Sequence, residues 1–371
     1  MRPTVAHVDL EAVRHNVRAL ASLTPAGTAL MAVVKADAYG HGAVPVARAA
    51  LEAGARWLGV ALVEEALELR EAGIGAPILV LGPTPDEALD AALARGISLA
   101  VFTPGRIDAM EHRARALGLE GRVHLKVDTG MGRVGSTPEE APALAERVHR
   151  SPHLRLEGVF SHFATADEAD LAFARHQLDA FRDVLRALGA RSIPPGIRHM
   201  ANTAGILALP ASHLDLVRAG IGIYGIYPSD EVARPVELRP VLRWTTRIAF
   251  LREVPAGTPL SYGRTHVTSG PRRIAVLPVG YADGYPRLLS NRGSVLVGGR
   301  RAPVVGRVCM DMTLADVTGV PGAREGDEAV LIGRQAGEEI TADEVARLTG
   351  TIAYEVTCNV GRRVPREYVG R

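Results

Sequence analysis

Lysine is nearly absent from the sequence. Only Lys35 and Lys126 occur in 371 residues, and the other 41 basic residues are arginines. Arginine stays protonated at any accessible pH, whereas a lysine amine in a desolvated site can lose its proton and act as a base or a nucleophile. The two lysines are therefore candidates for covalent or proton-transfer chemistry. The alternative is that a GC-rich genome has depleted lysine and left two at random.

Other absences exclude several protein classes. Two cysteines, Cys309 and Cys358, do not make a disulfide framework or a zinc cluster, so no metal site is expected. No apolar stretch reaches about 18 residues and the N-terminal segment lacks the apolar run of a signal peptide, so we expect a cytoplasmic protein. Because the net charge is only +2 and both signs are interspersed, we expect a small-molecule partner, with no nucleic acid and no membrane.

Between residues 30 and 220 the chain alternates short β-rich apolar runs with stretches rich in alanine, leucine and arginine. This alternation is typical of β/α units around a parallel sheet. The expected strands lie near residues 30–36, 57–62, 77–82, 97–102, 122–128, 156–162, 197–202 and 215–218. Eight repeats predict a closed, TIM-like (β/α)8 barrel. An open doubly wound sheet is disfavoured because no Gly-x-Gly-x-x-Gly turn follows the first strand.

The pattern changes near Pro235, where short alternating strands broken by glycine and proline begin. We therefore expect two domains, an α/β barrel at residues 1–235 and a mostly β domain at residues 236–371. A strand expected at residues 5–10 lies outside the eightfold count, so residues 1–10 are expected to pair with the C-terminal domain.

Reactive residue types follow several of the expected strands. In a (β/α)8 barrel the active site lies at the carboxyl ends of the strands. The residues expected there are Lys35, Lys126, Arg133, His162, Asn202, Thr203, Arg218, Gly220 and Ile221. One amine, several cations and loops with hydroxyls or glycine are therefore predicted to converge on one site.

Four segments carry a resemblance to a known family. They are Ala-Val-Val-Lys-Ala-Asp-Ala-Tyr-Gly-His-Gly at 32–42, His-Leu-Lys-Val-Asp-Thr-Gly-Met-Gly-Arg at 124–133, Ser-Tyr-Gly-Arg-Thr at 261–265 and Cys-Met-Asp at 309–311. In content and order they resemble alanine racemase, a pyridoxal 5′-phosphate enzyme family of fold type III, from about Val5 to Arg366. The resemblance implies a barrel, a β domain and a head-to-tail homodimer in which each site uses residues of the partner's C-terminal domain.

The resemblance assigns the two catalytic groups. It implies that Lys35 forms the Schiff base with the cofactor and then acts as base or acid on D-alanine. It implies that Tyr262 of the other subunit acts on L-alanine. Arg133 and a relay through His199 to Arg218 are the candidates to stabilise the tyrosine phenolate. From the residues alone, a packing role for Tyr262 beside a turn stays open.

The same resemblance assigns the cofactor site. It implies that Arg218 faces the pyridine nitrogen and, being positively charged, weakens the electron sink and suppresses transamination. The phosphate is expected to lie against Asn202, Thr203, the amides of Gly220 and Ile221, and the hydroxyls of Tyr39 and Tyr354. Glycine permits the close backbone approach that an anion site needs. Serine is as readily expected at position 203, and threonine keeps the hydroxyl.

The remaining assignments concern the substrate. Arg133 and the backbone amide of Met310 are expected to hold the carboxylate of alanine. Tyr281 is expected to bound a small substrate pocket, and Asp311 to support it. His162 is expected to pack on the cofactor ring, with a core histidine as the alternative. In many family members the lysine that matches Lys126 is carbamylated, and we expect the same here.

The sequence therefore predicts an isomerase that interconverts L-alanine and D-alanine and supplies D-alanine for peptidoglycan. Three alternatives stay open: a racemase of broader amino-acid range, a pyridoxal-phosphate-dependent decarboxylase, and a non-catalytic protein that binds the cofactor. A decarboxylase has no need of Tyr262 and would favour an acidic partner for the ring nitrogen over Arg218. A binding protein would have little use for the C-terminal domain.

Overall fold

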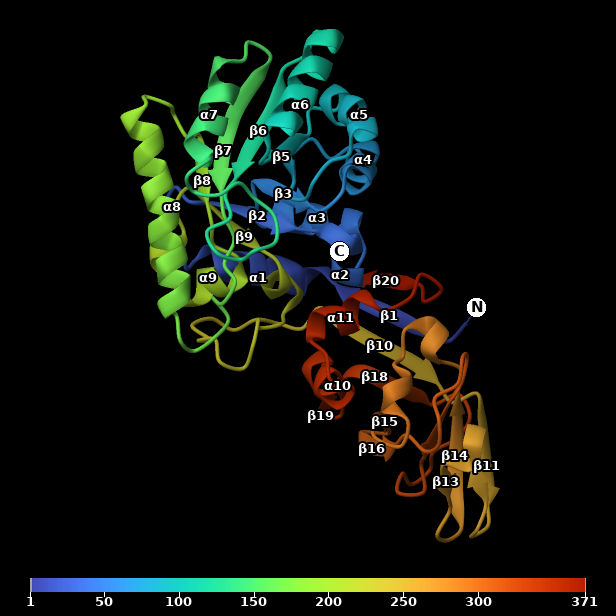
Figure 1. Cartoon of the computed structure of the whole chain (residues 1–371). Helices are drawn as coiled ribbons and strands as arrows, with labels where there is room; N and C mark the ends of the chain where they lie inside the picture. Colours follow the sequence, from blue (N-terminus) through green and yellow to red (C-terminus); the bar gives the residue numbers. More distant parts are fainter. Residues whose placement is uncertain (1, 371) are drawn as a thin grey trace. The chain divides into compact units, whose positions relative to one another are not determined.

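Eight short parallel strands close into a barrel (Figure 1). The structure, a computed structural model, describes residues 2–370. The barrel strands are β2 (Ala29–Val33), β3 (Trp57–Val60), β4 (Ile78–Val80), β5 (Ser98–Val101), β6 (Gly121–Lys126), β7 (Leu154–Phe160), β8 (Ile197–His199) and β9 (Leu216–Ala219). Pairing of β2 with β9 closes the ring, with Leu30 opposite Val217. The predicted eight-stranded barrel is confirmed.

Helices cover the outside of the barrel because each turns an apolar, alanine-rich face toward the strands. They are α1 (Leu10–Ala21), α3 (Ala43–Glu52), α4 (Val63–Glu71), α5 (Leu89–Ala94), α6 (Pro104–Leu117), α7 (Ala141–Arg150), α8 (Ala172–Ala190) and α9 (Thr203–Ala208). The ends of α6 follow directly from its sequence. Thr103 caps its N-terminus by accepting from the Arg106 N–H, and Gly118 ends it in the left-handed conformation. No helix among residues 2–370 is long and apolar enough to span a membrane.

The second compact unit is built mainly from residues 240–370, with residues up to Glu11 and residues 39–42. Its main sheet has the strand order β16-β15-β18-β10-β1-β20. These strands are β1 (Val5–Asp9), β10 (Leu242–Arg247), β15 (Ser294–Val297), β16 (Arg300–Pro303), β18 (Glu328–Gln335) and β20 (Arg366–Val369). The first strand pairs antiparallel with β10 and parallel with β20, so it joins this sheet instead of the barrel.

Smaller elements of this unit carry several predicted site residues. A three-stranded sheet has the order β11-β14-β17, and β12 pairs with β13. The bounds are β11 (Phe250–Val254), β12 (Pro259–Leu260), β13 (His266–Val267), β14 (Arg272–Leu277), β17 (Thr313–Asp316), β19 (Glu338–Ile340), α10 (Ala342–Thr349) and α11 (Ala353–Cys358). Short 3-10 turns are η4 (Tyr262–Arg264), η5 (Tyr281–Asp283) and η6 (Arg287–Leu289). The prediction of a mostly β C-terminal domain is confirmed.

The segment after β2 differs from the prediction. The expected strand to residue 36 ends at Val33, and α2 (Lys35–Gly40) follows. Four consecutive residues other than glycine, 36–39, have φ between 51° and 54°, which is the left-handed conformation. This conformation costs about 1–2 kcal/mol per residue. Tertiary hydrogen bonds offset the cost, since Glu65 accepts from the Ala36 N–H at 2.6 Å and Asp37 from the Ala43 N–H at 2.7 Å.

Gly284, in the C-terminal unit, provides a test of packing after η5. It has φ of 97°, and a Cβ placed on it would lie 1.8 Å from the Asn359 carbonyl oxygen. Gly337 has φ of 94° with no atom within 4 Å of such a Cβ. We expect Gly337→Ala to lower the free energy of unfolding by about 1 kcal/mol and Gly284→Ala by about 3 kcal/mol more, measured by urea unfolding. Equal losses would show that the Asn359 carbonyl moves aside freely.

Candidate active site

The barrel unit gathers cations at the carboxyl ends of its strands. His162 follows β7, and its pKa lies well below the usual value. Burial is the main cause, and the positive charges of Arg218, Lys126, Arg133 and Lys35 add to it. The imidazole is therefore neutral and lies in the field of four cations that come from three separate segments of the sequence. The structure thus brings these five predicted site residues together.

Arg218 lies in β9 and is almost fully buried. One terminal nitrogen donates to Nδ1 of His199 at 2.9 Å. The other contacts the carbonyls of Ser161 and Met200 at 2.7 and 2.8 Å, and Nδ1 of His162 at 3.1 Å. Burial lowers the pKa of Arg218 to about 9, so it remains a cation at neutral pH. Its Nε–H makes no hydrogen bond within residues 2–370, so this donor is available to an acceptor from outside the chain.

Lys126 ends β6 and is 6% exposed. Burial, followed by the nearby charges of Arg218, Arg133 and Lys35, lowers the pKa of its amine from 10.5 to about 8. Its Nζ lies 5.3 Å from the centre of the Phe160 ring. Roughly a tenth of such an amine is neutral at pH 7, compared with less than about a thousandth of a free lysine. Lys126 is therefore a buried amine with appreciable nucleophilic character.

A single carboxylate shapes the loop after β6. Asp128 accepts the backbone N–H groups of residues 130–133 at 2.8–3.1 Å. Burial raises the pKa of Asp128, but these four hydrogen bonds outweigh it and give a net lowering. A Cβ on Gly135 would lie 2.5 Å from the Asp128 amide nitrogen, so only glycine fits there. The loop is thereby folded around Asp128 and carries the exposed side chain of Arg133.

The segments after β8 and β9 meet at the Thr203 hydroxyl. Its oxygen accepts the N–H of Gly220 at 3.0 Å and of Gly222 at 3.3 Å, so its own hydrogen is left to donate. Ile221 begins η3 (Ile221–Tyr224), and its N–H has no acceptor within that turn. Asn202 accepts from the Gly205 N–H at 2.9 Å and caps α9. The Gly220 N–H therefore donates to the threonine hydroxyl in this structure, and contact of the Gly220 and Ile221 amides with a phosphate stays a prediction.

Two predicted phosphate ligands lie in the other unit. Tyr39 and Tyr354 both belong to it, and their ring centres are 6.1 Å apart at an interplanar angle of 48°. Tyr39 follows three other left-handed residues, and it is buried. The two tyrosines therefore form one aromatic pair within that unit.

Tyr262 is exposed on the C-terminal unit. Its side chain is 71% exposed, and its hydroxyl makes no hydrogen bond within residues 2–370. The preceding Ser261 has φ of 58° and ψ of −175°, close to a region that is essentially restricted to glycine. The Ser261 hydroxyl donates to the Arg307 carbonyl at 2.6 Å and holds this conformation. Tyr262 lines a cleft of about 390 Å³ together with Phe250 and Met312.

The loops of Tyr281 and Met310 are joined by backbone hydrogen bonds. The Tyr281 N–H donates to the Cys309 carbonyl and the Ala282 N–H to the Met310 carbonyl, both at 3.0 Å. A Cβ on Gly280 would lie 2.3 Å from the Cys309 oxygen, so this approach requires glycine. The Met310 N–H donates to no atom within the described chain, so it remains a donor for a ligand.

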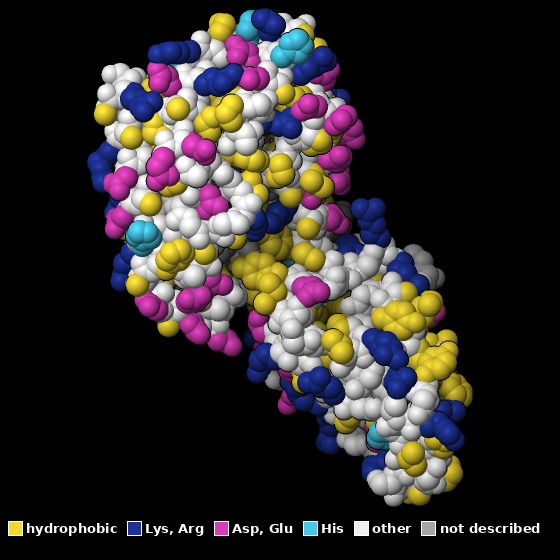
Figure 2. Space-filling model, viewed as in Figure 1, with side chains coloured by type: hydrophobic (Ala, Val, Ile, Leu, Met, Phe, Trp, Pro, Cys, Tyr) yellow, Lys and Arg dark blue, Asp and Glu magenta, His cyan; other side chains and the backbone are white. Residues whose placement is uncertain are grey.

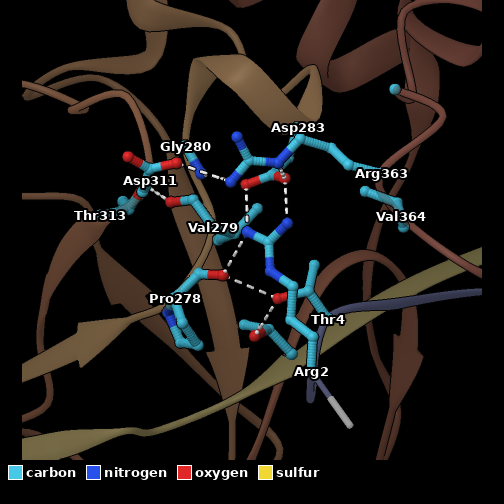
Figure 3. Close-up of polar contacts among 12 residues, drawn as sticks. Arg2, Thr4, Pro278, Val279, Gly280, Asp283, Asp311, Thr313, Arg363 and Val364 are labelled. Carbon is cyan, nitrogen blue, oxygen red and sulfur yellow. Dashed lines mark hydrogen bonds and ion pairs between the residues drawn. The ribbon is translucent and has the colours of Figure 1, made fainter.

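Asp283 anchors this region from inside the unit (Figure 3). It is fully buried and accepts from Arg2 and from Gly280, the latter at 3.0 Å. Arg363 Nε lies 2.9 Å from the same carboxylate, and another nitrogen of Arg363 donates to Asp311 at 2.6 Å. Asp311 is therefore linked through one arginine to a buried anchor.

Comparisons with known proteins agree with this arrangement. The family model described as alanine racemase, N-terminal domain, matches residues 8–228, and the model described as alanine racemase, C-terminal domain, matches residues 241–368. The chain belongs to the alanine racemase family. The resemblance found in the sequence is thereby confirmed.

Relatives in the alanine racemase family match over their full length. The alanine racemase of Symbiobacterium thermophilum is 53% identical over 370 residues, covering 100% of this chain and 98% of that protein. The alanine racemase of Desulfovibrio desulfuricans is 49% identical over 368 residues, covering 99% and 98%. The crystal structure of alanine racemase from D-cycloserine-producing Streptomyces lavendulae has a TM-score of 0.95 at 44% identity, covering 100% and 98%.

Some residues of this alanine racemase family site were not found from the sequence. His124 and Glu157 lie inside barrel strands and contact each other, and Asp283 and Arg363 support Asp311. His124 belongs to a segment quoted for its resemblance, yet its position in a strand gave no reason to single it out. A buried polar residue within an apolar strand is the signal that could have found it.

Proposed function

We propose that the protein interconverts L-alanine and D-alanine with pyridoxal 5′-phosphate bound at the carboxyl ends of the barrel strands. The observation that carries the proposal is Arg218, a buried cation whose Nε–H has no acceptor within residues 2–370. The barrel residues fit the cofactor, because that N–H suits a ring nitrogen and the Thr203 hydroxyl and Ile221 N–H suit a phosphate. When bound, the cofactor supplies the electron sink for removal of the α-hydrogen.

The protein groups supply orientation and proton transfer. In the proposal, Lys35 holds the cofactor covalently and moves a proton on one face of the α-carbon. Arg133 and the Met310 N–H hold the substrate carboxylate, and His162, which is neutral, packs on the ring. Tyr262 moves the proton on the opposite face. Arg218, as a cation, disfavours protonation of the ring nitrogen and so keeps the reaction from running on to transamination.

The test of the proposed function measures both the exchange of the α-hydrogen and the change of configuration at the α-carbon. Purified protein with pyridoxal phosphate is incubated with L-alanine in deuterated water, and α-deuteration and D-alanine are measured together. Both should rise together if two groups act on opposite faces. Deuteration without D-alanine would indicate that only one base acts. The absence of both signals would favour the binding-protein alternative or another substrate. A panel of other L-amino acids tests a broader racemase.

Carbamylation of Lys126 is the first prediction from this site. The neutral amine attacks carbon dioxide, loses a proton and becomes a carbamate, which replaces a positive charge beside Arg133 with a negative one. Because burial lowers the pKa of Lys126 to about 8, the reactive form is available near neutral pH. We expect a carbamate signal in the ¹³C spectrum with labelled bicarbonate, and no such signal in Lys126→Ala. A signal that persists in the variant would place the modification elsewhere.

We further propose that the partner is a second copy of this chain, arranged head to tail. Apolar side chains of the C-terminal unit are strongly exposed: Met310 and Met312 at 53%, Phe250 at 51% and Tyr262 at 71%. Figure 2 shows hydrophobic surface over the part of this unit that carries β11, β13 and β14. Large exposed apolar patches are typical of interaction sites, and a tyrosine whose hydroxyl makes no hydrogen bond within residues 2–370 fits a site completed between copies.

Mixed subunits test whether the site is shared. Lys35→Ala and Tyr262→Phe chains are each expected to be inactive, and dissociating and reassociating them together should restore about a quarter of wild-type activity. Half of the dimers would be hybrids, and each hybrid has one site with both groups intact. Activity that stays absent in verified hybrids would show that Lys35 and Tyr262 of the same chain act together.

We also propose a cellular role for the protein: it makes D-alanine in the cytoplasm for peptidoglycan.

A further inference from the structure

A chain of polar side chains crosses the interior of the barrel and ends far from the predicted ligands. Arg218 contacts Nδ1 of His199 at 2.9 Å, and Nε2 of His199 lies 2.9 Å from Nδ1 of His124. Nε2 of His124 lies 3.4 Å from a carboxylate oxygen of Glu157, which also accepts from the Ser98 hydroxyl. These five residues come from five neighbouring strands, β5 to β9, and the pairing of those strands brings them together.

The contacts determine which nitrogen of each histidine carries its proton. Arginine only donates, so Nδ1 of His199 must be an acceptor. Burial is the main reason that the pKa values of His199 and His124 are lowered, so each ring is neutral and has one N–H. His199 therefore donates from Nε2 to Nδ1 of His124, and the single proton of His124 lies on Nε2. Nε2 of His124 makes no hydrogen bond within residues 2–370, and the carboxylate that approaches it, at 3.4 Å, is that of Glu157.

The rings have little freedom to rearrange. His199 is stacked on Phe160, with centres 4.7 Å apart and planes at 7°. His124 meets Trp57 edge-on, with centres 5.4 Å apart. Both histidines are fully buried. A ring that cannot flip changes its hydrogen bonds only by moving its proton, so the tautomers depend on the groups at the two ends of the chain, Arg218 and Glu157.

That terminal group is an ionised carboxylate. Burial raises the pKa of Glu157, but the nearby His124 ring, the hydrogen bond from Ser98 and the charge of Arg122 outweigh burial and give a net lowering. A carboxylate only accepts hydrogen bonds, so it admits one proton arrangement for the two histidines. With the opposite arrangement, a proton on Nδ1 of His199 would point at the Arg218 N–H at 2.9 Å.

We propose that Glu157 is a positioning residue that, through His124, holds His199 in the Nε2–H tautomer and thereby fixes the guanidinium of Arg218. The assignment of the tautomers stands on the geometry of the barrel alone. The effect on catalysis rests on the proposed function, in which Arg218 faces the cofactor. Glu157 acts at a distance, through two intervening rings, and touches neither cofactor nor substrate in this role.

The test compares variants of Glu157 in the full-length protein with bound cofactor. Nitrogen NMR of ¹⁵N-histidine-labelled protein reports which ring nitrogen is protonated, and His124→Gln and His199→Gln identify the two signals. We expect Nε2–H for both rings in the wild type and in Glu157→Gln, whose amide oxygen still accepts. In Glu157→Met, which has similar size and no acceptor, we expect mixed tautomers. Ser98→Ala is the matched control, because it removes a hydrogen bond to the same carboxylate but leaves the acceptor for His124.

Kinetics give a second readout. We expect Glu157→Met to lower kcat about tenfold with little change in KM, and Glu157→Gln to restore most of it. A merely structural role would instead lower the melting temperature in all three variants and leave the tautomers unchanged. Nδ1–H on either histidine in the wild type would overturn the inference even if every variant failed to fold. Correct tautomers in a protein without racemase activity would support the relay and refute the proposed function.

Discussion

Replacing Lys35 with alanine should abolish racemisation, with a loss of at least about 10,000-fold in kcat. The variant loses both the covalent attachment of the cofactor and one of the two proton-transfer groups, and a positioned acid–base group alone contributes about 100- to 10,000-fold. Lys35→Arg should be equally inactive, because a guanidinium stays protonated and cannot serve as an amine nucleophile. The measurement is the conversion of L-alanine to D-alanine by chiral chromatography.

The scarcity of lysine makes the attachment site directly measurable. Reduction of the cofactor-loaded protein with borohydride, followed by peptide mapping, should label Lys35 and leave Lys126 unlabelled. Lys126→Ala is the matched variant, since it removes the only other lysine. It should retain the label at Lys35 and lose much less activity. Label on Lys126, or activity in Lys35→Ala, would contradict the assignment.

Replacing Tyr262 with phenylalanine should remove inversion but leave exchange on one face. With Lys35 intact, D-alanine should still exchange its α-hydrogen with deuterated water, while formation of L-alanine falls about 1,000-fold. The expected asymmetry arises because the hydroxyl lost from Tyr262 acts only on the face of L-alanine. Proton NMR of the α-position and chiral chromatography, applied to the same sample, measure the two events separately.

Tyr285 offers a control for the loss of a hydroxyl in the same unit. Its side chain is fully buried, and its hydroxyl makes no hydrogen bond within the described chain. Tyr285→Phe removes an unsatisfied buried polar group and should leave both exchange and inversion intact. Equal rates of exchange and inversion in Tyr262→Phe would show that another group protonates the second face.

The barrel was predictable because its signal is local. Each β/α unit repeats the same alternation of apolar runs and alanine-rich helices, and eight such repeats are enough to specify a closed sheet. The strands expected near residues 57–62, 97–102 and 122–128 are observed at Trp57–Val60, Ser98–Val101 and Gly121–Lys126. These segments show hydrophobic periodicity that does not depend on distant contacts.

The features that could not be predicted from the sequence depend on contacts between residues that are distant in the chain. The left-handed turn at 36–39 follows an apolar run that looks like a longer strand, and it is held by Glu65, which is 29 residues from Ala36. His124 and Glu157 look like ordinary strand positions, and they meet only after β6 and β7 pair. The chemical roles of Arg218 and Lys126 could be predicted from their residue types and their positions at strand ends. The residues that contact them could be identified only from the folded structure.

The left-handed turn also restricts which amino acids evolution can place next to the reactive lysine. Valine, isoleucine and threonine tolerate this backbone region poorly, because their branched Cβ crowds the carbonyl group. Glycine, asparagine and aspartate tolerate it best, and none of the four residues here, Ala36, Asp37, Ala38 and Tyr39, is branched at Cβ. The absence of a β-branched residue directly after Lys35 therefore follows from backbone geometry as well as from catalysis.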